Sequence, residues 1–139
     1  MTTKIRTELS KKNEYYISKY RYMELKYFCL QYDEWKKEYQ SMSYISSKNF
    51  PGVKNRNTFS DSTGNIAVRR SYLAEKLKLV EQTAIETDEE LFPYLILAVT
   101  KGLTYNELYL LRDMPCGRTR YYKLYRKFFY LLSQKKHSS

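Results

Sequence analysis

Basic and hydroxyl side chains gather near the carboxyl end of this 139-residue chain. From residue 118 to residue 136 the segment contains seven Lys/Arg and no acidic residue. At 100° per residue, one side of a helix here carries Thr119, Arg120, Lys123, Arg126, Lys127 and Tyr130, with Arg118 and Tyr122 at its borders. Such a face suits DNA, because cations release the counterions of phosphates and an amphipathic helix fits the major groove. The alternative is a solvated basic helix.

The candidate DNA-binding residues divide by their place along this helix. Residues near its start can reach base edges, and later ones can reach the backbone. The base or near-base candidates are Arg118, Thr119, Arg120, Tyr122 and Lys123. The phosphate candidates are Arg126, Lys127, Lys135 and Lys136.

The opposite side of the same helix is apolar and predicts a core face. It carries Tyr121, Leu124, Tyr125, Phe128, Leu131 and Leu132. Spacings of three and four residues place these side chains on one stripe. We expect this stripe to pack on the two preceding helices.

Two capping-box patterns predict those preceding helices. Residues 87–90 and 104–107 each read Thr-x-x-Glu, in which the hydroxyl and the carboxylate satisfy free amides at a helix start. The first predicts a helix over 91–101 that ends at Gly102 as a left-handed cap. The second predicts a helix over Tyr105–Arg112 that buries Leu108 and Leu111 and stops because Pro115 disfavours helical geometry at Met114. Residues 87–139 are therefore expected to form a trihelical helix-turn-helix domain with a short basic tail.

Residues 1–86 are expected to form a long helical hairpin that serves oligomerisation. One helix is predicted over about 13–44, with an aromatic stripe of Tyr16, Tyr20, Tyr27, Phe28, Tyr32, Trp35, Tyr39 and Met42. Core packing of this stripe is favoured over stacking on single-stranded bases. A second helix is predicted from about 63–65 to 85, with Ile66, Leu73, Leu77, Val80 and Ala84 facing the first. Leftover apolar surface at Tyr72 and Leu79 could form a dimer seam.

Residues 46–63 are expected to be a loop between the two long helices, because Ser, Asn, Gly, Pro and Asp are frequent there. Its cations Lys48, Lys54 and Arg56 could touch phosphates, although a solvated linker is the simpler interpretation. The fold class is thus all-α.

The charge is concentrated at the two ends of the sequence. The formal net charge is +10, divided as +6 over residues 1–60, −3 over 61–99 and +7 over 100–139. AT-rich coding can raise the frequency of Lys, Tyr, Asn and Ile, but it does not explain this clustering. The chain holds two cysteines and no apolar run long enough to span a membrane, which favours a reducing cytoplasm.

Catalytic and metal-binding groups are sparse. The single histidine, His137, lies in a Lys-rich tail, and one His with two distant Cys cannot assemble a metal cluster. Cys116 could react if a helix start and nearby arginines lowered its pKa, but a small residue filling a turn is favoured. Asp88, Glu89 and Glu90 point in different directions on a helix and suit its dipole better than a metal. We therefore expect no enzyme activity, no catalytic residue, no metal and no cofactor.

The region from Gly102 to Leu108, with Leu111, Met114 and the basic helix, resembles the helix-turn-helix at the end of bacterial sigma factors. Over about residues 30–134 the chain resembles the RinA-like phage regulators more closely, on segments 32–36, 66–76 and 114–118. This resemblance implies sigma-like activation of phage late operons, with promoter binding and contact with host RNA polymerase in the bacterial cytoplasm. The chain departs from the sigma pattern because Asp113 replaces the turn glycine and the turn is about two residues longer.

These observations predict a sequence-specific regulator that binds double-stranded DNA, with a dimer favoured among homo-oligomers. A small terminase-like DNA-packaging subunit is the main alternative, since it also joins a helix-turn-helix to an oligomerising helical region. A structural coiled-coil protein whose basic ends have no nucleic-acid role is the third interpretation.

Overall fold

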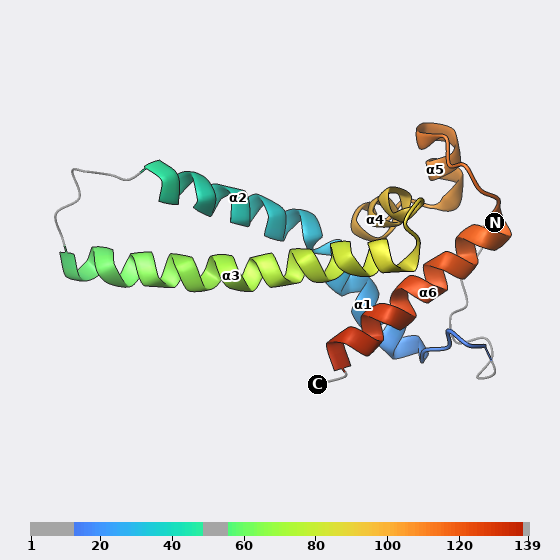
Figure 1. Ribbon diagram of the computed structural model, residues 1–139, viewed down its shortest axis with the longest axis horizontal. Coiled ribbons are helices and arrows are strands. Elements are labelled where there is room, and N and C mark those ends of the chain that lie inside the picture. The colour runs from blue at the N-terminus through green and yellow to red at the C-terminus, as the bar shows by residue number, and fades with distance from the viewer. Residues whose placement is uncertain (1–12, 49–55, 138–139) are drawn as a thin grey trace. The chain divides into compact units, whose positions relative to one another are not determined.

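The structure is a computed structural model that describes residues 13–48 and 56–137, with side chains placed for 13–42 and 64–137. The described residues form helices and no strand, so the all-α prediction is confirmed. Figure 1 shows the helices in chain order: α1 (Lys19–Leu30), α2 (Tyr32–Lys48), α3 (Arg56–Thr87), α4 (Phe92–Lys101), α5 (Tyr105–Arg112) and α6 (Arg118–His137).

The chain divides into two compact units. The described residues of unit 1 are 13–31 and 79–137, and unit 2 is Tyr32–Lys78. Unit 1 thus holds α1, α4, α5, α6 and the end of α3, whereas unit 2 holds α2 and most of α3. The sequence predicts a domain boundary between residues 86 and 87. The structure divides the chain differently, because α1 belongs with the carboxyl-terminal helices.

The single helix predicted over 13–44 is wrong, because two helices occupy this stretch. α1 begins only at Lys19, where the Ser18 hydroxyl accepts a hydrogen bond from the Arg21 N–H at 3.3 Å. α1 ends where the Gln31 N–H bonds the Phe28 carbonyl at 3.2 Å, three residues back instead of four. No glycine or proline marks this break, which is why the pattern missed it.

The aromatic stripe is only partly buried. Tyr32 and Trp35 belong to the core as predicted, but Tyr20 and Tyr27 are 75% and 57% exposed. Leu25 and Cys29 supply the fully buried side chains of α1 instead. The prediction counted tyrosine as an apolar residue, although its hydroxyl also suits the surface.

The predicted loop over 46–63 is too long. α2 continues to Lys48, and α3 begins at Arg56, so the Ser and Asn residues of this stretch, and Gly64 just after it, do not stop the helices. Such residues cost at most about 1 kcal/mol each in a helix, which a 32-residue helix absorbs. Residues 49–55, and the side chains of Lys48, Lys54 and Arg56, lie outside the described part of the chain.

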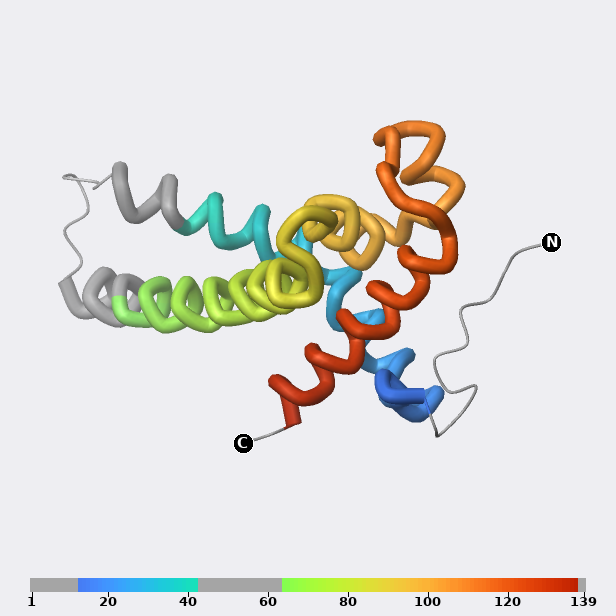
Figure 2. Tube along the Cα trace, turned by 45° about the vertical axis from the view of Figure 1, so that its right-hand side comes forward, coloured from blue at the N-terminus to red at the C-terminus, as the bar shows by residue number. Residues whose placement is uncertain are grey.

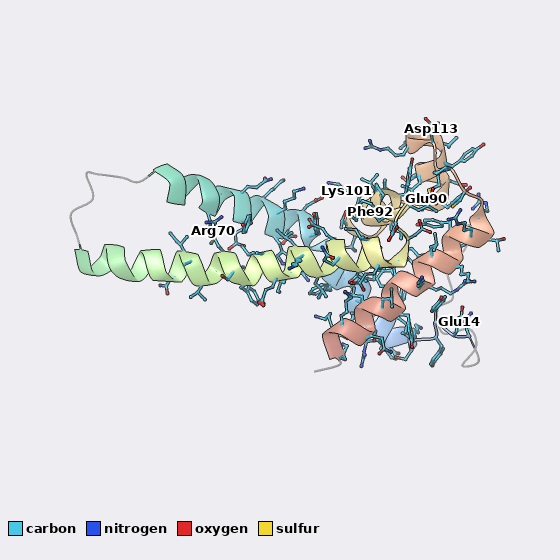
Figure 3. The ribbon with its side chains drawn as sticks, viewed as in Figure 1. Glu14, Arg70, Glu90, Phe92, Lys101 and Asp113 are labelled. Atoms are coloured by element: carbon cyan, nitrogen blue, oxygen red, sulfur yellow. The ribbon has the colours of Figure 1, made fainter. Side chains whose placement is uncertain are left out.

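Unit 2 is a helical hairpin in which α2 runs beside α3 (Figure 1). Arg69 on α3 reaches Glu38 on α2 with two hydrogen bonds of 2.7 and 3.0 Å. Arg70, labelled in Figure 3, donates to the Tyr39 hydroxyl at 3.3 Å. Leu73 and Leu77 on α3 are buried as the sequence predicts, while Ile66 is half-buried.

The capping box predicted at residues 87–90 is wrong. Thr87 is the last residue of α3, and its hydroxyl donates to the Thr83 carbonyl at 2.7 Å. Asp88 caps the turn that precedes α4, since its Oδ1 accepts from the N–H groups of Glu90 at 2.9 Å and Leu91 at 2.8 Å, whereas Leu91, the N-cap of α4 itself, makes no side-chain cap bond. Aspartate is as good a cap as threonine, and the preceding residue can remain in α3.

The short helices of unit 1 follow the sequence closely. α4 ends at Gly102, which adopts the left-handed conformation at φ 69°. The predicted capping box of α5 is confirmed, since the Thr104 Oγ1 accepts from the Glu107 N–H at 3.2 Å and the Thr104 N–H donates to Glu107 Oε1 at 2.9 Å. Leu108 is fully buried, but the prediction for Leu111 is wrong because that side chain is 70% exposed.

The core face of α6 is confirmed, apart from Leu131, which is half-buried. Phe129 and Ser133 add to it. The tube in Figure 2 shows α6 crossing α1, and these two helices pack directly on each other. α1 is therefore a main partner of α6 that the sequence did not assign, and it also packs on α4.

Candidate nucleic-acid interface

The turn between α5 and α6 is held by one unusual backbone position and one side chain. Asp113, labelled in Figure 3, follows α5 with φ 54°, the only positive φ outside glycine among the described residues. Asp adopts this left-handed region more readily than most residues, so it can replace a turn glycine. The Tyr105 hydroxyl at the start of α5 donates to the Cys116 carbonyl at 2.6 Å. These contacts fix where α6 begins.

Arg118, a predicted base-contacting residue, is engaged within the protein. Its guanidinium lies 4.8 Å from the centre of the Tyr105 ring and donates to Oδ1 of Asn106. A further bond of 3.4 Å reaches the Tyr122 hydroxyl. In this conformation Arg118 joins the start of α6 to the start of α5, which positions the helix.

Arg120 is also paired, although it remains 55% exposed. Its guanidinium lies 3.2 Å from Oδ2 of Asp88, the residue that caps the turn before α4. Partial burial alone would raise the pKa of Asp88, but the N–H groups of Leu91 and Glu90 and the Arg120 guanidinium together hold it below its ordinary value. Asp88 is therefore charged at neutral pH and holds Arg120 beside the turn.

Four of the predicted residues form what we call the open basic face: Thr119, Lys123, Arg126 and Lys127. Thr119 and Lys123 are exposed, and Arg126 and Lys127 are half-buried. Steps of four, three and one residue place them on one side of α6 over about 12 Å of helix length. Within the described part of the chain, none of the three cations forms an ion pair, and α6 contains no acid.

Tyr122, the remaining predicted residue, belongs to an aromatic cluster at the border of this face. Its ring centre lies 5.3 Å from that of Tyr121 and 6.4 Å from that of Tyr105. Its packing against α5 makes it a poor candidate for reaching a base. The structure therefore brings all seven predicted residues to the start and middle of α6 but leaves only four of them unpaired.

The basic side chains at the carboxyl end of α6 contact other helices of the protein. Lys135 Nζ lies 2.8 Å from Oε2 of Glu86, and Lys136 Nζ lies 3.9 Å from the centre of the Phe28 ring. His137 Nε2 is 3.6 Å from Oε1 of Glu24. These contacts anchor the helix end on α1 and α3, so Lys135 and Lys136 are less available to phosphates than the sequence predicts.

An exposed apolar patch on α5 was not predicted. Tyr109, Leu110 and Leu111 are 57%, 75% and 70% exposed. Three consecutive residues of a helix span about 200° and cannot all face one core, which is the signal that the sequence offered. A run of this kind is typical of a surface that contacts another molecule.

The structure does not favour a reactive thiol at Cys116 or a metal site among the described residues. Burial raises the pKa of the Cys116 thiol, although Arg120 nearby acts in the opposite direction. This opposes the reactive-thiol alternative, because the thiolate is the nucleophile. The described residues contain no group of three or more His, Cys, Asp or Glu that could hold a metal ion. A search of those residues also finds no helix with the length and apolar character that crossing a membrane requires.

Comparisons with protein-family models, with curated proteins and with solved structures each find no match. The similarity to the RinA-like regulators therefore depends on the sequence segments named above and remains a hypothesis.

Proposed function

We propose that this protein is a sequence-specific DNA-binding transcriptional regulator whose α6 lies in the major groove of double-stranded DNA. The observation that carries the proposal is the division of α6 into a buried aromatic side and an acid-free side with Lys123, Arg126 and Lys127 unpaired. Basic helices on protein surfaces normally mix both signs of charge. A face of one sign that is open to solvent suits phosphates and base edges.

The contacts around the start of α6 support the proposal that its first turns contact DNA base edges. α5 and the turn at Asp113 position the helix start, and the Arg118 and Arg120 contacts hold that start in place. Fixing a recognition helix before binding reduces the conformational entropy lost in the complex. Thr119 and Lys123 are then the residues best placed for base edges, and Arg126 and Lys127 for phosphates.

A footprint on genomic DNA from the same source tests sequence-specific binding. We expect protection of discrete sites by the wild type, and a weaker footprint for Lys123→Ala, since a base contact contributes about 1–3 kcal/mol. Lys37→Ala is the matched control, because Lys37 is an exposed lysine on α2. Uniform protection of all DNA, or equal footprints for both variants, would contradict the assignment.

The resemblance to RinA-like regulators supports the narrower proposal of a phage late-gene activator that works with host RNA polymerase as a dimer. Transcription in vitro from a footprinted promoter, with purified bacterial polymerase, tests it directly. An increase in transcript that requires Lys123 would support an activator. A decrease in transcript on adding the protein would indicate a repressor. Mass measurement in solution separates a dimer from the many-subunit ring of a small terminase-like DNA-packaging subunit.

A further inference from the structure

A groove of about 540 Å³ opens in unit 1 between α1, α6 and the junction of α4 and α5. Its volume lies within the range of small-molecule sites, roughly 300–1,000 Å³. Aromatic rings supply much of its wall, namely those of Tyr22, Tyr105, Tyr121, Tyr122, Tyr125 and Phe129. On α6 the groove is lined by Tyr121, Tyr122, Tyr125 and Phe129 and by none of the four residues of the open basic face, although Tyr122 borders that face.

The aromatic wall is built by contacts within the protein. The Tyr22 ring meets that of Phe129 edge to face at 5.2 Å between centres, and its hydroxyl lies 3.0 Å from that of Tyr125. At the other end the Tyr121 ring lies 5.4 Å from Tyr105 and 5.3 Å from Tyr122. Tyr22 and Tyr122 are half-buried and can present ring surface to a planar ligand, whereas Tyr105, Tyr121, Tyr125 and Phe129 are buried and support those two rings from beneath. Rings held in place in this way lose little conformational entropy when a ligand binds.

The charge of the groove has a single sign. Lys19 and Lys26 line it from α1, where a spacing of seven residues places them on one side of the helix. Both are exposed, and among the described residues neither forms an ion pair. No described residue of the lining is acidic.

We propose that this groove binds a small planar aromatic anion, with its ring on the tyrosines and its negative group at Lys19 and Lys26. A purely apolar occupant would offer the two ammonium groups no opposite charge, and an anion lacking a ring would leave the aromatic wall uncovered. A ligand with both features matches the whole lining. Such a ligand would contact α1, α4 and α6 together.

Two fluorescent probes of similar shape test the proposal without DNA, so its outcome is independent of the proposed function. Anilinonaphthalene sulfonate carries the anionic group, and N-phenyl-1-naphthylamine lacks it. We expect saturable binding of the sulfonate at one site per chain, and weaker binding of the neutral probe. Lys26→Glu should weaken the sulfonate about tenfold, as the loss of a charge-assisted contact does, and leave the neutral probe unchanged.

Two control variants separate the groove from general surface effects. Lys37→Glu makes the same charge change on α2, outside the groove, and should keep sulfonate binding. Met23→Trp enlarges a half-exposed lining residue and should weaken both probes, whereas Val68→Trp on α3 should weaken neither. Helix content by circular dichroism confirms that each variant is folded.

The proposal is overturned if both probes bind equally, or if Lys26→Glu and Lys37→Glu have the same effect on the sulfonate. A dimer that the sulfonate dissociates, and that Met23→Trp abolishes, would also overturn it, because the groove would then belong to a second copy of the chain.

Discussion

Unit 1 and unit 2 differ in the kind of contact that stabilises each of them internally. In unit 1, α6 contributes the fully buried side chains Phe128, Phe129 and Leu132. In the described part of unit 2 the buried apolar side chains are fewer, namely Tyr32, Trp35, Leu73 and Leu77. Several contacts between α2 and α3 there involve charged groups, such as Arg69 with Glu38 at 2.7 Å and Lys76 over Trp35 at 4.8 Å. Burial of a large apolar side chain stabilises by about 1.5–3 kcal/mol, whereas an exposed ion pair contributes much less. Unit 1 should therefore be the more resistant to unfolding, as a fixed platform for α6 requires.

The largest expected effect is in the aromatic core of unit 1. Phe128→Ala should lower the free energy of unfolding by about 3–5 kcal/mol, because it removes a ring from a fully buried site. Urea denaturation followed by circular dichroism measures this change. The control is Tyr20→Ala, which removes an aromatic ring that is 75% exposed and should change stability by less than about 0.5 kcal/mol. An equal loss of unfolding free energy in the two variants would contradict the assignment of Phe128 to the core and Tyr20 to the surface.

The next effect concerns the start of α5. Thr104→Ala removes the hydroxyl that accepts from the Glu107 N–H and should destabilise unit 1 by about 1 kcal/mol. Thr104→Ser keeps an accepting hydroxyl and should restore most of the loss. If the serine variant is as unstable as the alanine variant, the loss of stability comes from removing the threonine methyl group and not the hydroxyl.

A smaller effect should depend on pH at Asp88. Its pKa is lowered in the folded protein, so its charge stabilises the fold above the unfolded pKa of about 3.9, and this contribution is lost as pH falls through the folded value. Asp88→Asn keeps an accepting oxygen but loses the charge opposite Arg120. We expect it to cost about 0.2–1 kcal/mol at pH 7, and the difference from the wild type should shrink as pH falls through the pKa of folded Asp88. A difference that stays constant as the carboxylate is protonated would show that the charge is not its cause.

The smallest effect is expected in unit 2. The Arg69 and Glu38 side chains are 44% and 38% exposed, so water and salt weaken their attraction. Glu38→Gln should leave the urea midpoint within experimental error, both at low salt and at 0.5 M salt. A large shift of that midpoint would show that charged contacts carry the stability of unit 2.

Local signals in the sequence predicted much of unit 1. The Thr104–Glu107 box, Gly102 and the apolar stripe of α6 each depend on neighbours within a few residues, so a single sequence specifies them. The packing of α1 on α6 joins residues about 100 positions apart, such as Tyr22 and Tyr125, which no local pattern contains. The pairing of Arg120 was hidden for the same reason, since Asp88 is 32 positions away, whereas Arg118 pairs with the nearer Asn106 and Tyr122. The break at Gln31 was missed because no glycine or proline marks it.

The dependence of DNA affinity on salt tests the central proposal most directly. The wild type and a variant carrying Lys123→Ala, Arg126→Ala and Lys127→Ala are titrated with a labelled duplex over a range of salt concentrations. We predict a slope of log K against log salt that is shallower in this variant by about 2, because Arg126 and Lys127 are assigned to phosphates and each phosphate contact contributes about 0.9. A variant carrying Lys36→Ala, Lys37→Ala and Lys78→Ala loses the same net charge from α2 and α3 and should keep the wild-type slope. Equal slopes in the two variants would contradict the account.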